Sequence, residues 1–163
     1  MGEYAPTDAP LDATGMRLAV VAGRFNAHIT ERLLEGALVE LRDLGGREPP
    51  VHWVPGAFEI PLVAKRLAGS GTVDSVICLG AVVRGETAHF EYVAGPCAAG
   101  VAQAALETGI PVIFGVLTTN DEGQAMARAG GSDSNKGAEA VRTAVEMVQL
   151  LRSLPREAGP GRC

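Results

Sequence analysis

The sequence predicts an α/β fold, a three-layer α/β/α sandwich with a four-stranded parallel sheet. Short apolar segments alternate four times with segments whose apolar residues repeat at helical spacing. No turn signal typical of a hairpin joins two of the apolar segments. The chain of 163 residues has the length of one domain. Right-handed crossovers would place helices on both faces of its sheet.

The apolar segments are the expected strands. Residues 17–22 (RLAVVA) and 51–54 (VHWV) predict two short strands, and residues 111–117 (PVIFGVL) predict the fourth. Residues 75–83 (SVICLGAVV) are apolar throughout, which is typical of a strand covered on both faces. Because ligands of such sheets bind at the carboxyl ends of the strands, the loops that follow the strands are the places to search for a site.

Five helices are expected between and after these strands. The first follows Asn26, a typical N-cap residue, and carries apolar residues at every fourth position, namely Ile29, Leu33, Ala37 and Leu41. The second carries Ile60, Val63, Ala64 and Leu67. A long third helix covers about residues 88–106, and Pro96 is expected to kink it or split it.

The last two helices flank a glycine-rich loop. A short helix over residues 121–128 would have Thr119 or Asn120 as its cap. The loop GGSDSN (130–135) then opens the final helix. The apolar stripe of that helix comprises Val141, Ala144, Val145, Val148 and Leu151.

The two ends of the chain differ from its middle. Residues 1–15 predict a flexible N-terminal arm and residues 155–163 a C-terminal tail, which leaves 16–154 as a single domain. The N-terminus has acids and prolines where a signal peptide needs a basic patch and an apolar stretch. No apolar run is long enough to span a bilayer. We therefore expect a cytoplasmic protein with no membrane partner.

Composition excludes other classes of protein. The 14 basic and 19 acidic residues give a net charge of −5 without a basic stripe, so nucleic acid is not an expected partner. The histidines lie far apart and show no metal-ligand spacing, so no metal site is expected. Cys78, Cys97 and Cys163 show no CxxC pairing and suit reduced thiols better than a disulfide framework.

Aromatic residues make up only 4% of the chain, and all four phenylalanines fall in the loop motifs. Phe25, after the first strand, could stack on a planar ring or pack as a staple against its own helix. Glu59, after the second strand, could accept hydrogen bonds from a polyol or complement the dipole of its helix. The residues alone leave both alternatives open.

The loop after the third strand carries the most informative chemistry. Gly85 lets the backbone bend, Thr87 offers a hydroxyl and an N–H group, and the following helix start adds further N–H groups, so that together they can hold a phosphate. The side chain of Glu86 must then point away, leaving only its N–H to help. His89 lies in the first helical turn and is placed for proton transfer.

Two basic residues flank the glycine-rich loop. Arg128 and Lys136 could each clamp a phosphate or could lie in solvent. Neither a nucleophile elbow nor a dinucleotide fingerprint is present in the sequence. These residues predict a small α/β enzyme that handles one phosphorylated substrate and one planar or polyol substrate, with a histidine as acid/base.

Taken together, these segments resemble the lumazine synthase family of riboflavin biosynthesis. The likeness covers about residues 16–152, nearly the whole expected domain. Each motif is moderately specific alone, but the set is highly specific in this order and spacing. The motifs are RFN (24–26), PGAFEIP (55–61), GAVVRGETAHFEYV (80–93), PVIFGVLTT (111–119), Arg128 and NKG (135–137).

The resemblance implies a role for each matching residue. His89 matches the general acid/base. The residues that would bind 5-amino-6-(D-ribitylamino)uracil are Phe25, which stacks on its ring, Ala57, Phe58, Glu59, Ala81, Val82, Val83 and, from a neighbouring subunit, Phe114. The residues that would bind the phosphate of 3,4-dihydroxy-2-butanone 4-phosphate are Glu86, Thr87, Arg128 and Lys136.

The resemblance also implies a flavodoxin-like fold, a reaction and an assembly. An imine forms between the two substrates, phosphate is eliminated and the ring closes with loss of water, without a metal or an organic cofactor. Members are homopentamers with sites between adjacent subunits, and some form icosahedral capsids of sixty subunits, for which riboflavin synthase is a candidate cargo. The short GGSDSN loop favours a capsid, whereas Pro96 departs from the uninterrupted helix that lines the pentamer channel.

Two other functions remain open at this point. One is a protein that binds or stores flavin or lumazine and has lost the chemistry, against which the presence of Thr87, His89 and Arg128 weighs. The other is a scaffold whose role is assembly. The N-terminal arm is expected to pair with the edge of a neighbour's sheet.

Overall fold

A computed structural model describes residues 7–131 and 134–155 and contains the expected parallel sheet. Its strands are β1 (Leu18–Gly23), β2 (Val51–Val54), β3 (Ser75–Val83) and β4 (Val112–Thr119). The spatial order is β2-β1-β3-β4, and every neighbouring pair is parallel. The carboxyl ends of all the strands in this sheet therefore lie at one edge, which is where the candidate loops begin.

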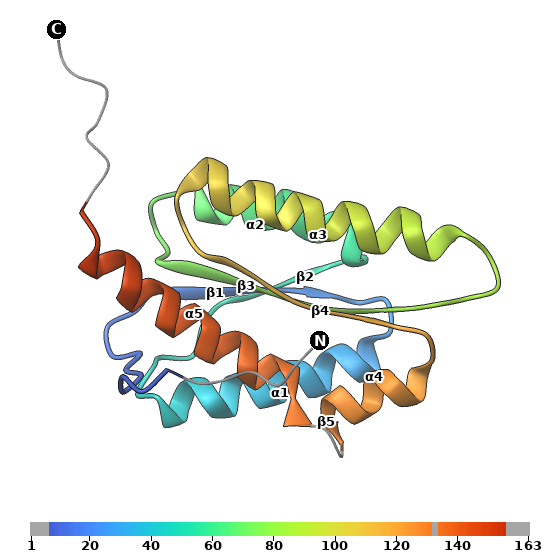
Figure 1. The fold of residues 1–163 in the computed structure, drawn as a ribbon, viewed down its shortest axis with the longest axis horizontal. Coiled ribbons are helices and arrows are strands. Elements are labelled where there is room, and N and C mark those ends of the chain that lie inside the picture. Colours follow the sequence, from blue (N-terminus) through green and yellow to red (C-terminus); the bar gives the residue numbers. More distant parts are fainter. Residues whose placement is uncertain (1–6, 132–133, 156–163) are drawn as a thin grey trace, which may run out of the picture.

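Helices cover both faces of this sheet, which confirms the three-layer sandwich (Figure 1). On one face lie α2 (Ile60–Ala68), preceded by the short 3₁₀ helix η1 (Ala57–Glu59), and α3 (His89–Thr108). On the other lie α1 (Ala27–Asp43), α4 (Glu122–Arg128) and α5 (Lys136–Ser153).

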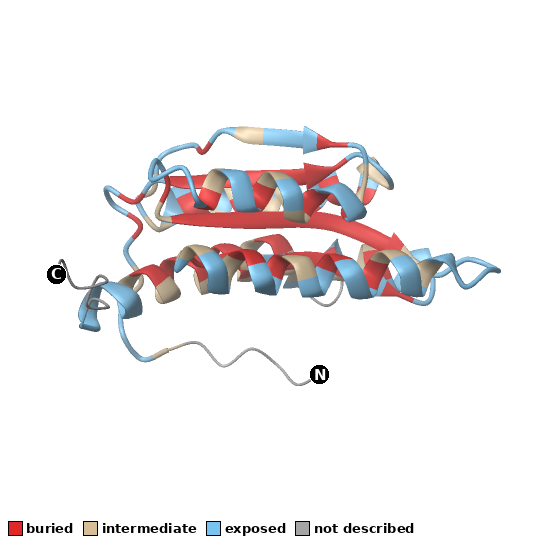
Figure 2. Cartoon of the chain, turned by 90° about the horizontal axis from the view of Figure 1, so that it is seen from above, coloured by how far each residue is buried: buried red, intermediate tan, exposed pale blue. Residues whose placement is uncertain are grey.

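The core is divided by the sheet into two apolar clusters. Along β3, Ile77 and Leu79 pack with residues of α1 and α5, whereas Val76 and Cys78 pack with residues of α2 and α3. The central strands are therefore buried on both faces, as Figure 2 shows in red, and the apolar run of residues 75–83 is explained. Strand β2, at the edge of the sheet, is exposed at His52 and Trp53.

Pro96 does not split the long helix, where the sequence predicted a kink or a break. Helix α3 runs from His89 to Thr108 as one element with Pro96 inside it. Proline removes one backbone donor from the helix. Buried residues on both sides of it, including Ala94, Cys97 and Val101, anchor the helix to the sheet, and this packing keeps it in one piece.

The start of α4 differs from the prediction. Neither Thr119 nor Asn120 is the cap; Asp121 takes that position, and its carboxylate accepts a hydrogen bond from the N–H of Gln124 at 2.8 Å. The hydroxyl of Thr119 instead donates to the carbonyl of Asp121 at 2.9 Å. Strand β4 continues to Thr119, two residues further than predicted, so this residue belongs to the sheet.

The glycine-rich loop contains a pair of short strands that the sequence did not predict. Strand β5 (Ala129–Gly131) pairs antiparallel with β6 (Ser134–Asn135). Gly130 and Ser134 both have positive φ angles, of 96° and 87°. A serine seldom adopts such a backbone conformation, so its type gave no signal for this pair of strands.

The described part of the N-terminal segment contacts the domain. Ala13 is fully buried in the α1 and α5 cluster, and its N–H donates to the carbonyl of Leu44 at 2.8 Å. The other residues of the expected arm, 1–6, and residues 156–163 of the expected tail lie outside the described residues. Among the helices within residues 7–131 and 134–155, none is long and apolar enough to cross a membrane.

Candidate active site

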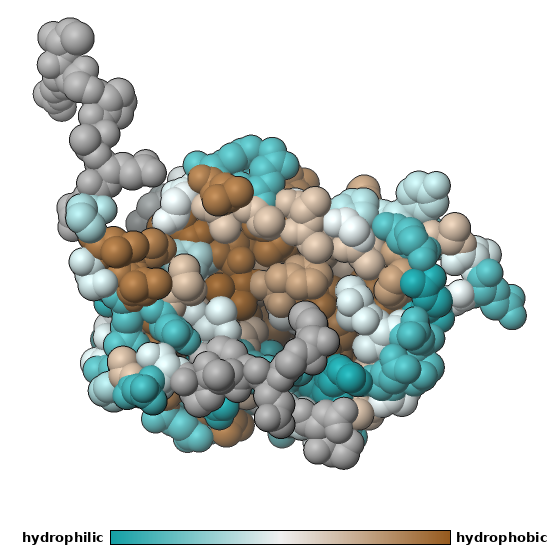
Figure 3. Space-filling view, viewed as in Figure 1, coloured by the Kyte–Doolittle hydropathy of each residue, from teal (hydrophilic) through white to brown (hydrophobic). Residues whose placement is uncertain are grey.

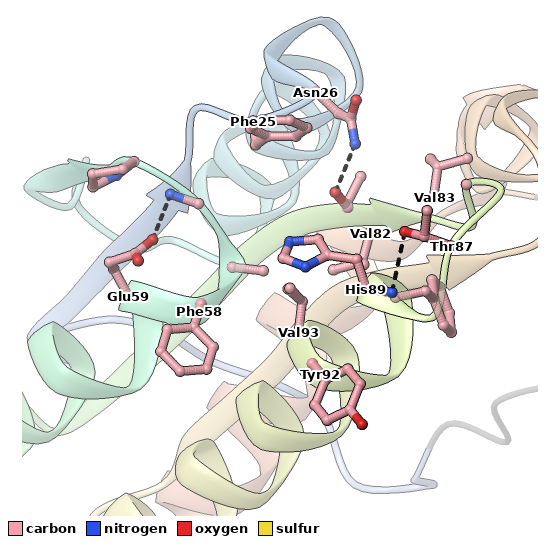
Figure 4. A pocket seen from close by; sticks show the side chains of 16 residues that line it. Phe25, Asn26, Phe58, Glu59, Val82, Val83, Thr87, His89, Tyr92 and Val93 are labelled. Carbon is pink, nitrogen blue, oxygen red and sulfur yellow. Dashed lines mark hydrogen bonds between the residues drawn. The ribbon is translucent and has the colours of Figure 1, made fainter.

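A cleft of about 640 Å³ lies at the carboxyl ends of β1, β2 and β3 (Figure 4). The loops after these strands and the first turns of α3 form its walls. The residues that line it are Phe25, Asn26, Pro55, Gly56, Ala57, Phe58, Glu59, Ala81, Val82, Val83, Gly85, Thr87, His89, Phe90, Tyr92 and Val93. This position agrees with the general rule for ligands of parallel sheets.

Phe25 lies on the loop after β1. Backbone hydrogen bonds to the end of β2 and to the residue after it hold this loop in place. The N–H groups of Arg24 and Phe25 donate to the carbonyls of Val54 and Pro55 at 2.9 and 3.0 Å. The Phe25 side chain is 75% exposed, so it is not buried against its own helix as a staple would be. Its ring borders the cleft and is available for stacking.

Asn26 has a structural role that its sequence position did not reveal. It precedes α1, as expected of an N-cap residue, but its side chain makes no capping hydrogen bond. Instead, the amide donates to the carbonyl of Ala81 at 2.9 Å, and the residue has a left-handed backbone with φ of 57°. Asparagine adopts this conformation more readily than most residues. The bond fixes the Phe25 loop to the end of β3.

Glu59 is held by its own turn. One carboxylate oxygen accepts a hydrogen bond from the N–H of Gly56 at 3.0 Å, which closes the turn after β2. This contact supports the interpretation of Glu59 as a residue that stabilises its helix start, while the side chain still lines the cleft. Phe58, beside it, is 58% exposed and forms the wall opposite Phe25 (Figure 4).

His89 begins α3 and faces the cleft. Figure 4 shows its ring between Phe25 on one side and Phe58 and Val93 on the other. The hydroxyl oxygen of Thr87 accepts a hydrogen bond from the His89 N–H at 3.4 Å, so the two residues are joined at the helix start. The N–H groups at such a start are suited to an anion.

Two further cleft residues, Tyr92 and Val93, were not singled out from the sequence. They lie three and four positions after His89, so all three project from one face of the first turns of α3. The helical spacing from His89 was the signal that could have found them. They extend the apolar wall of the cleft beyond the loop.

Glu91, in the first turn of α3, forms an ion pair with Arg84. Its carboxylate accepts a hydrogen bond from the Arg84 guanidinium at 2.6 Å. This hydrogen bond is the main cause that lowers the pKa of Glu91 below its usual range. Glu91 is therefore ionised at neutral pH and is compensated by Arg84.

Comparison with known proteins agrees with these motifs. Residues 15–152 match the sequence pattern of the 6,7-dimethyl-8-ribityllumazine synthase family. The chain belongs to the 6,7-dimethyl-8-ribityllumazine synthase family. The enzyme of that name from Thermus thermophilus is 60% identical over 148 residues, which cover 90% of this chain and 94% of the relative.

More distant members of the lumazine synthase family also match most of the chain. The enzymes of that name from Protochlamydia amoebophila and Syntrophus aciditrophicus are each 52% identical. The first match covers 88% of this chain and 85% of the relative. The second covers 91% and 97%.

Four residues that the lumazine synthase resemblance assigns to substrate do not line this cleft: Glu86, Phe114, Arg128 and Lys136. Phe114 lies on the edge strand β4 and pairs in register with Cys78. Arg128 ends α4, where its guanidinium donates to the carbonyl of Gln124 at 2.9 Å. Lys136 begins α5 and forms an ion pair with Glu139 at 2.7 Å. The cleft of a single chain is therefore lined by no lysine or arginine among the described residues.

Proposed function

We propose that this chain condenses 5-amino-6-(D-ribitylamino)uracil with 3,4-dihydroxy-2-butanone 4-phosphate to form 6,7-dimethyl-8-ribityllumazine, with release of phosphate and water. This is a transferase reaction of riboflavin biosynthesis. The observation that carries the proposal is the family match over residues 15–152 together with a cleft that holds Phe25, Thr87 and His89.

The uracil substrate would bind along the wall formed by the first three strand ends. The Phe25 ring would stack on the planar ring of the substrate. Backbone groups of residues 81–83 and of residues 57–59 would bind its polar edge and its ribityl chain. The exposure of the Phe25 and Phe58 rings supports this assignment, because both are open to a ligand.

The phosphorylated substrate would bind at the start of α3. The N–H groups of Glu86 and Thr87 and the Thr87 hydroxyl would hold its phosphate. His89 would move protons as the imine forms, as phosphate leaves and as the ring closes. Most of the acceleration would come from positioning two substrates side by side, which requires no metal or organic cofactor.

The working unit would be a homopentamer with shared sites. A phosphate dianion is best held by arginine or lysine, yet the cleft of one chain has neither among its described lining residues. Phe114, Arg128 and Lys136 would therefore complete the cleft of a neighbouring subunit. Figure 3 supports an interface, because apolar side chains lie across the middle of the face between the two helix layers.

Higher assembly is a further part of this proposal. Pentamers of the domain over residues 16–154 would join into a sixty-subunit capsid in the cytoplasm, with riboflavin synthase as its cargo. The N-terminal arm would pair with the exposed edge of β2 in a neighbour. Light scattering tests the assembly: a particle mass of five or sixty chains is expected, and a monomer would contradict it.

One assay tests the activity. The purified protein is incubated with both substrates, and formation of the lumazine chromophore is followed by absorbance. Steady turnover supports the proposal. Binding of the uracil substrate without any product would instead indicate a protein that binds or stores such ligands. Full activity in isolated pentamers would exclude assembly as the primary role.

A further inference from the structure

Arg84 has more contacts around the cleft than any role assigned above requires. Its backbone N–H donates to the carbonyl of Thr119 at 2.9 Å, and its Nε donates to the Asn120 side chain at 3.3 Å. Its Nη1 donates to Glu91 at 2.6 Å, and its guanidinium lies 4.3 Å from the centre of the Phe90 ring. One residue therefore joins the end of β3, the end of β4 and the first turn of α3.

Stability alone does not account for this arrangement. The Arg84 and Glu91 side chains are 42% and 54% exposed, and ion pairs that are this exposed contribute little to folding. Arg84 contacts Phe90 and Glu91, which are the two residues immediately after His89 in α3. Phe90 also lines the cleft. The contacts therefore act on the part of the helix that carries the candidate acid/base.

The charge of Glu91 explains why a cation is needed here. Glu91 is the acidic residue in the first turn of α3, where the N–H groups suit an anion. An uncompensated carboxylate at this helix start would repel a phosphate that binds there, since like charges at close range cost free energy. The guanidinium compensates this charge and also fixes the direction of the carboxylate.

We propose that Arg84 is a positioning residue for the phosphate monoester substrate. It holds the Glu91 carboxylate away from the anion and keeps the Phe90 ring against the cleft, so that the start of α3 accepts a dianion. This inference rests on the proposed function, because it assigns the phosphorylated substrate to that site.

Steady-state kinetics of Arg84→Ala test the inference. We expect KM for the phosphorylated substrate to rise about tenfold, while KM for the uracil substrate and kcat change less than about threefold. Lys65→Ala is the matched control. Lys65 lies on α2, forms an exposed ion pair with Glu107 of α3 and does not line the cleft. This control is expected to leave both KM values unchanged.

A second variant separates charge from structure. In Arg84→Ala/Glu91→Gln the uncompensated carboxylate is gone, so KM for the phosphorylated substrate should return to within about threefold of that of the unmodified chain. In Arg84→Lys, KM for the phosphorylated substrate should also stay within about threefold of that of the unmodified chain, because lysine keeps the positive charge. The small remaining effect would reflect the loss of planar stacking on Phe90. A purely structural role would leave Arg84→Ala and the double variant equally impaired.

The outcomes are distinguishable from a failure of the proposed function. If the unmodified chain makes no lumazine, the proposed function fails before any variant is compared. If it is active, an unchanged KM in Arg84→Ala overturns the inference, and so does the absence of rescue in the double variant. Inhibition by inorganic phosphate gives a second readout, and Arg84→Ala should weaken it about as much as it raises KM.

Discussion

At the scale of single residues, the position of His89 determines what its loss should do. Its ring faces the cleft between the exposed rings of Phe25 and Phe58, which are the two placed to hold a planar substrate ring. A residue that acts mainly on proton transfer affects the chemical step more than it affects binding. The effect should therefore fall on turnover.

We predict that His89→Ala lowers kcat by on the order of 10²-fold while both KM values stay within about threefold. Initial rates of lumazine formation measure this effect. His52→Ala is the matched control, because His52 is an exposed histidine of β2 that does not line the cleft, and its rates should be unchanged. An unaltered kcat in His89→Ala would remove this residue from the mechanism.

The sequence was sufficient to predict that Phe25, Glu59 and Thr87 lie around one cleft, and insufficient to predict their local partners. Parallel strands align their carboxyl ends, so Phe25, Glu59 and Thr87 had to lie near one another. The hydrogen bond from Asn26 to Ala81 joins residues 55 positions apart, and no local pattern encodes such a contact. Arg84 was likewise missed because its partners lie at the end of β4 and in the first turn of α3, up to 36 positions away in the chain.

At the scale of elements, the start of α5 depends on a close approach to α1. Asn135 accepts hydrogen bonds from the N–H groups of Gly137 and Ala138 at 2.8 and 3.2 Å, and its amide donates to the carbonyl of Arg32 at 2.9 Å. A Cβ atom on Gly137 would lie 1.9 Å from the carbonyl oxygen of Leu33. The NKG motif therefore has a structural role in joining two helices.

We predict that Gly137→Ala lowers the free energy of unfolding by about 2–3 kcal/mol, because backbone of α1 must move to admit the methyl group. Denaturant unfolding measures this loss. Gly95→Ala is the matched control, because Gly95 is also helical and a Cβ there meets nothing within 4 Å. The control should be neutral or slightly stabilising, and an equal loss in both variants would contradict the steric explanation.

Asp74 joins β1 to β3 through an ion pair with Arg17. The carboxylate accepts hydrogen bonds from the backbone N–H and the guanidinium of Arg17 at 2.8 and 2.9 Å. The hydrogen bond from the Arg17 side chain is the largest cause that lowers the pKa of Asp74. A carboxyl group whose pKa is lower in the folded state stabilises the fold above its unfolded pKa, and this contribution is lost as the pH falls through the folded value.

We predict that Asp74→Asn costs about 1–2 kcal/mol of unfolding free energy at pH 7 and that the difference from the unmodified chain shrinks below about pH 4. Urea unfolding at several pH values measures both. Asp12→Asn serves for comparison, because Asp12 is exposed and its pKa is lowered mainly by a local hydrogen bond from Thr14. A pH-independent loss in Asp74→Asn would exclude the ionic explanation.

At the scale of the whole molecule, the proposed sharing of sites can be tested by mixing subunits. His89 lines the cleft of its own chain, whereas Arg128 does not. Arg128→Ala alone should mainly raise KM for the phosphorylated substrate. If Arg128 acts in a neighbour's cleft, a mixed ring contains some sites with both residues intact.

We predict that co-assembled His89→Ala and Arg128→Ala chains, mixed in equal amounts, regain activity at about a quarter of their sites, because each site draws from two subunits at random. Rates of the mixture are compared with those of each variant alone. The absence of any gain, in particles that light scattering shows to be mixed, would place both residues in one subunit's site. His89→Ala mixed with His89→Ala/Arg128→Ala is the control that should gain nothing.

The overall fold was predicted more completely than the details of its connections. Apolar runs flanked by helical repeats were enough to predict every strand of the large sheet, with β2 and β3 at their observed bounds. The pairing of β5 with β6 was missed because both strands are short and β6 contains Ser134 in an uncommon backbone conformation. Pro96 does not split α3, and the sequence pattern did not reveal how buried residues on both sides of it anchor the helix to the sheet.

The strand order also determines how this chain can fold. Every strand of the large sheet pairs with a parallel neighbour. Because β1 pairs with β3, the elements α1, β2, η1 and α2 lie between these partners in the chain. Such contacts between distant segments require the closure of long loops before they stabilise anything, which slows folding. Helices can form early, but the sheet is completed only after β3 has paired with β1 and β4, the last strand of this sheet in the chain, has paired with β3. Until then the apolar strand surfaces remain exposed, and this interval is when the chain is most prone to aggregation.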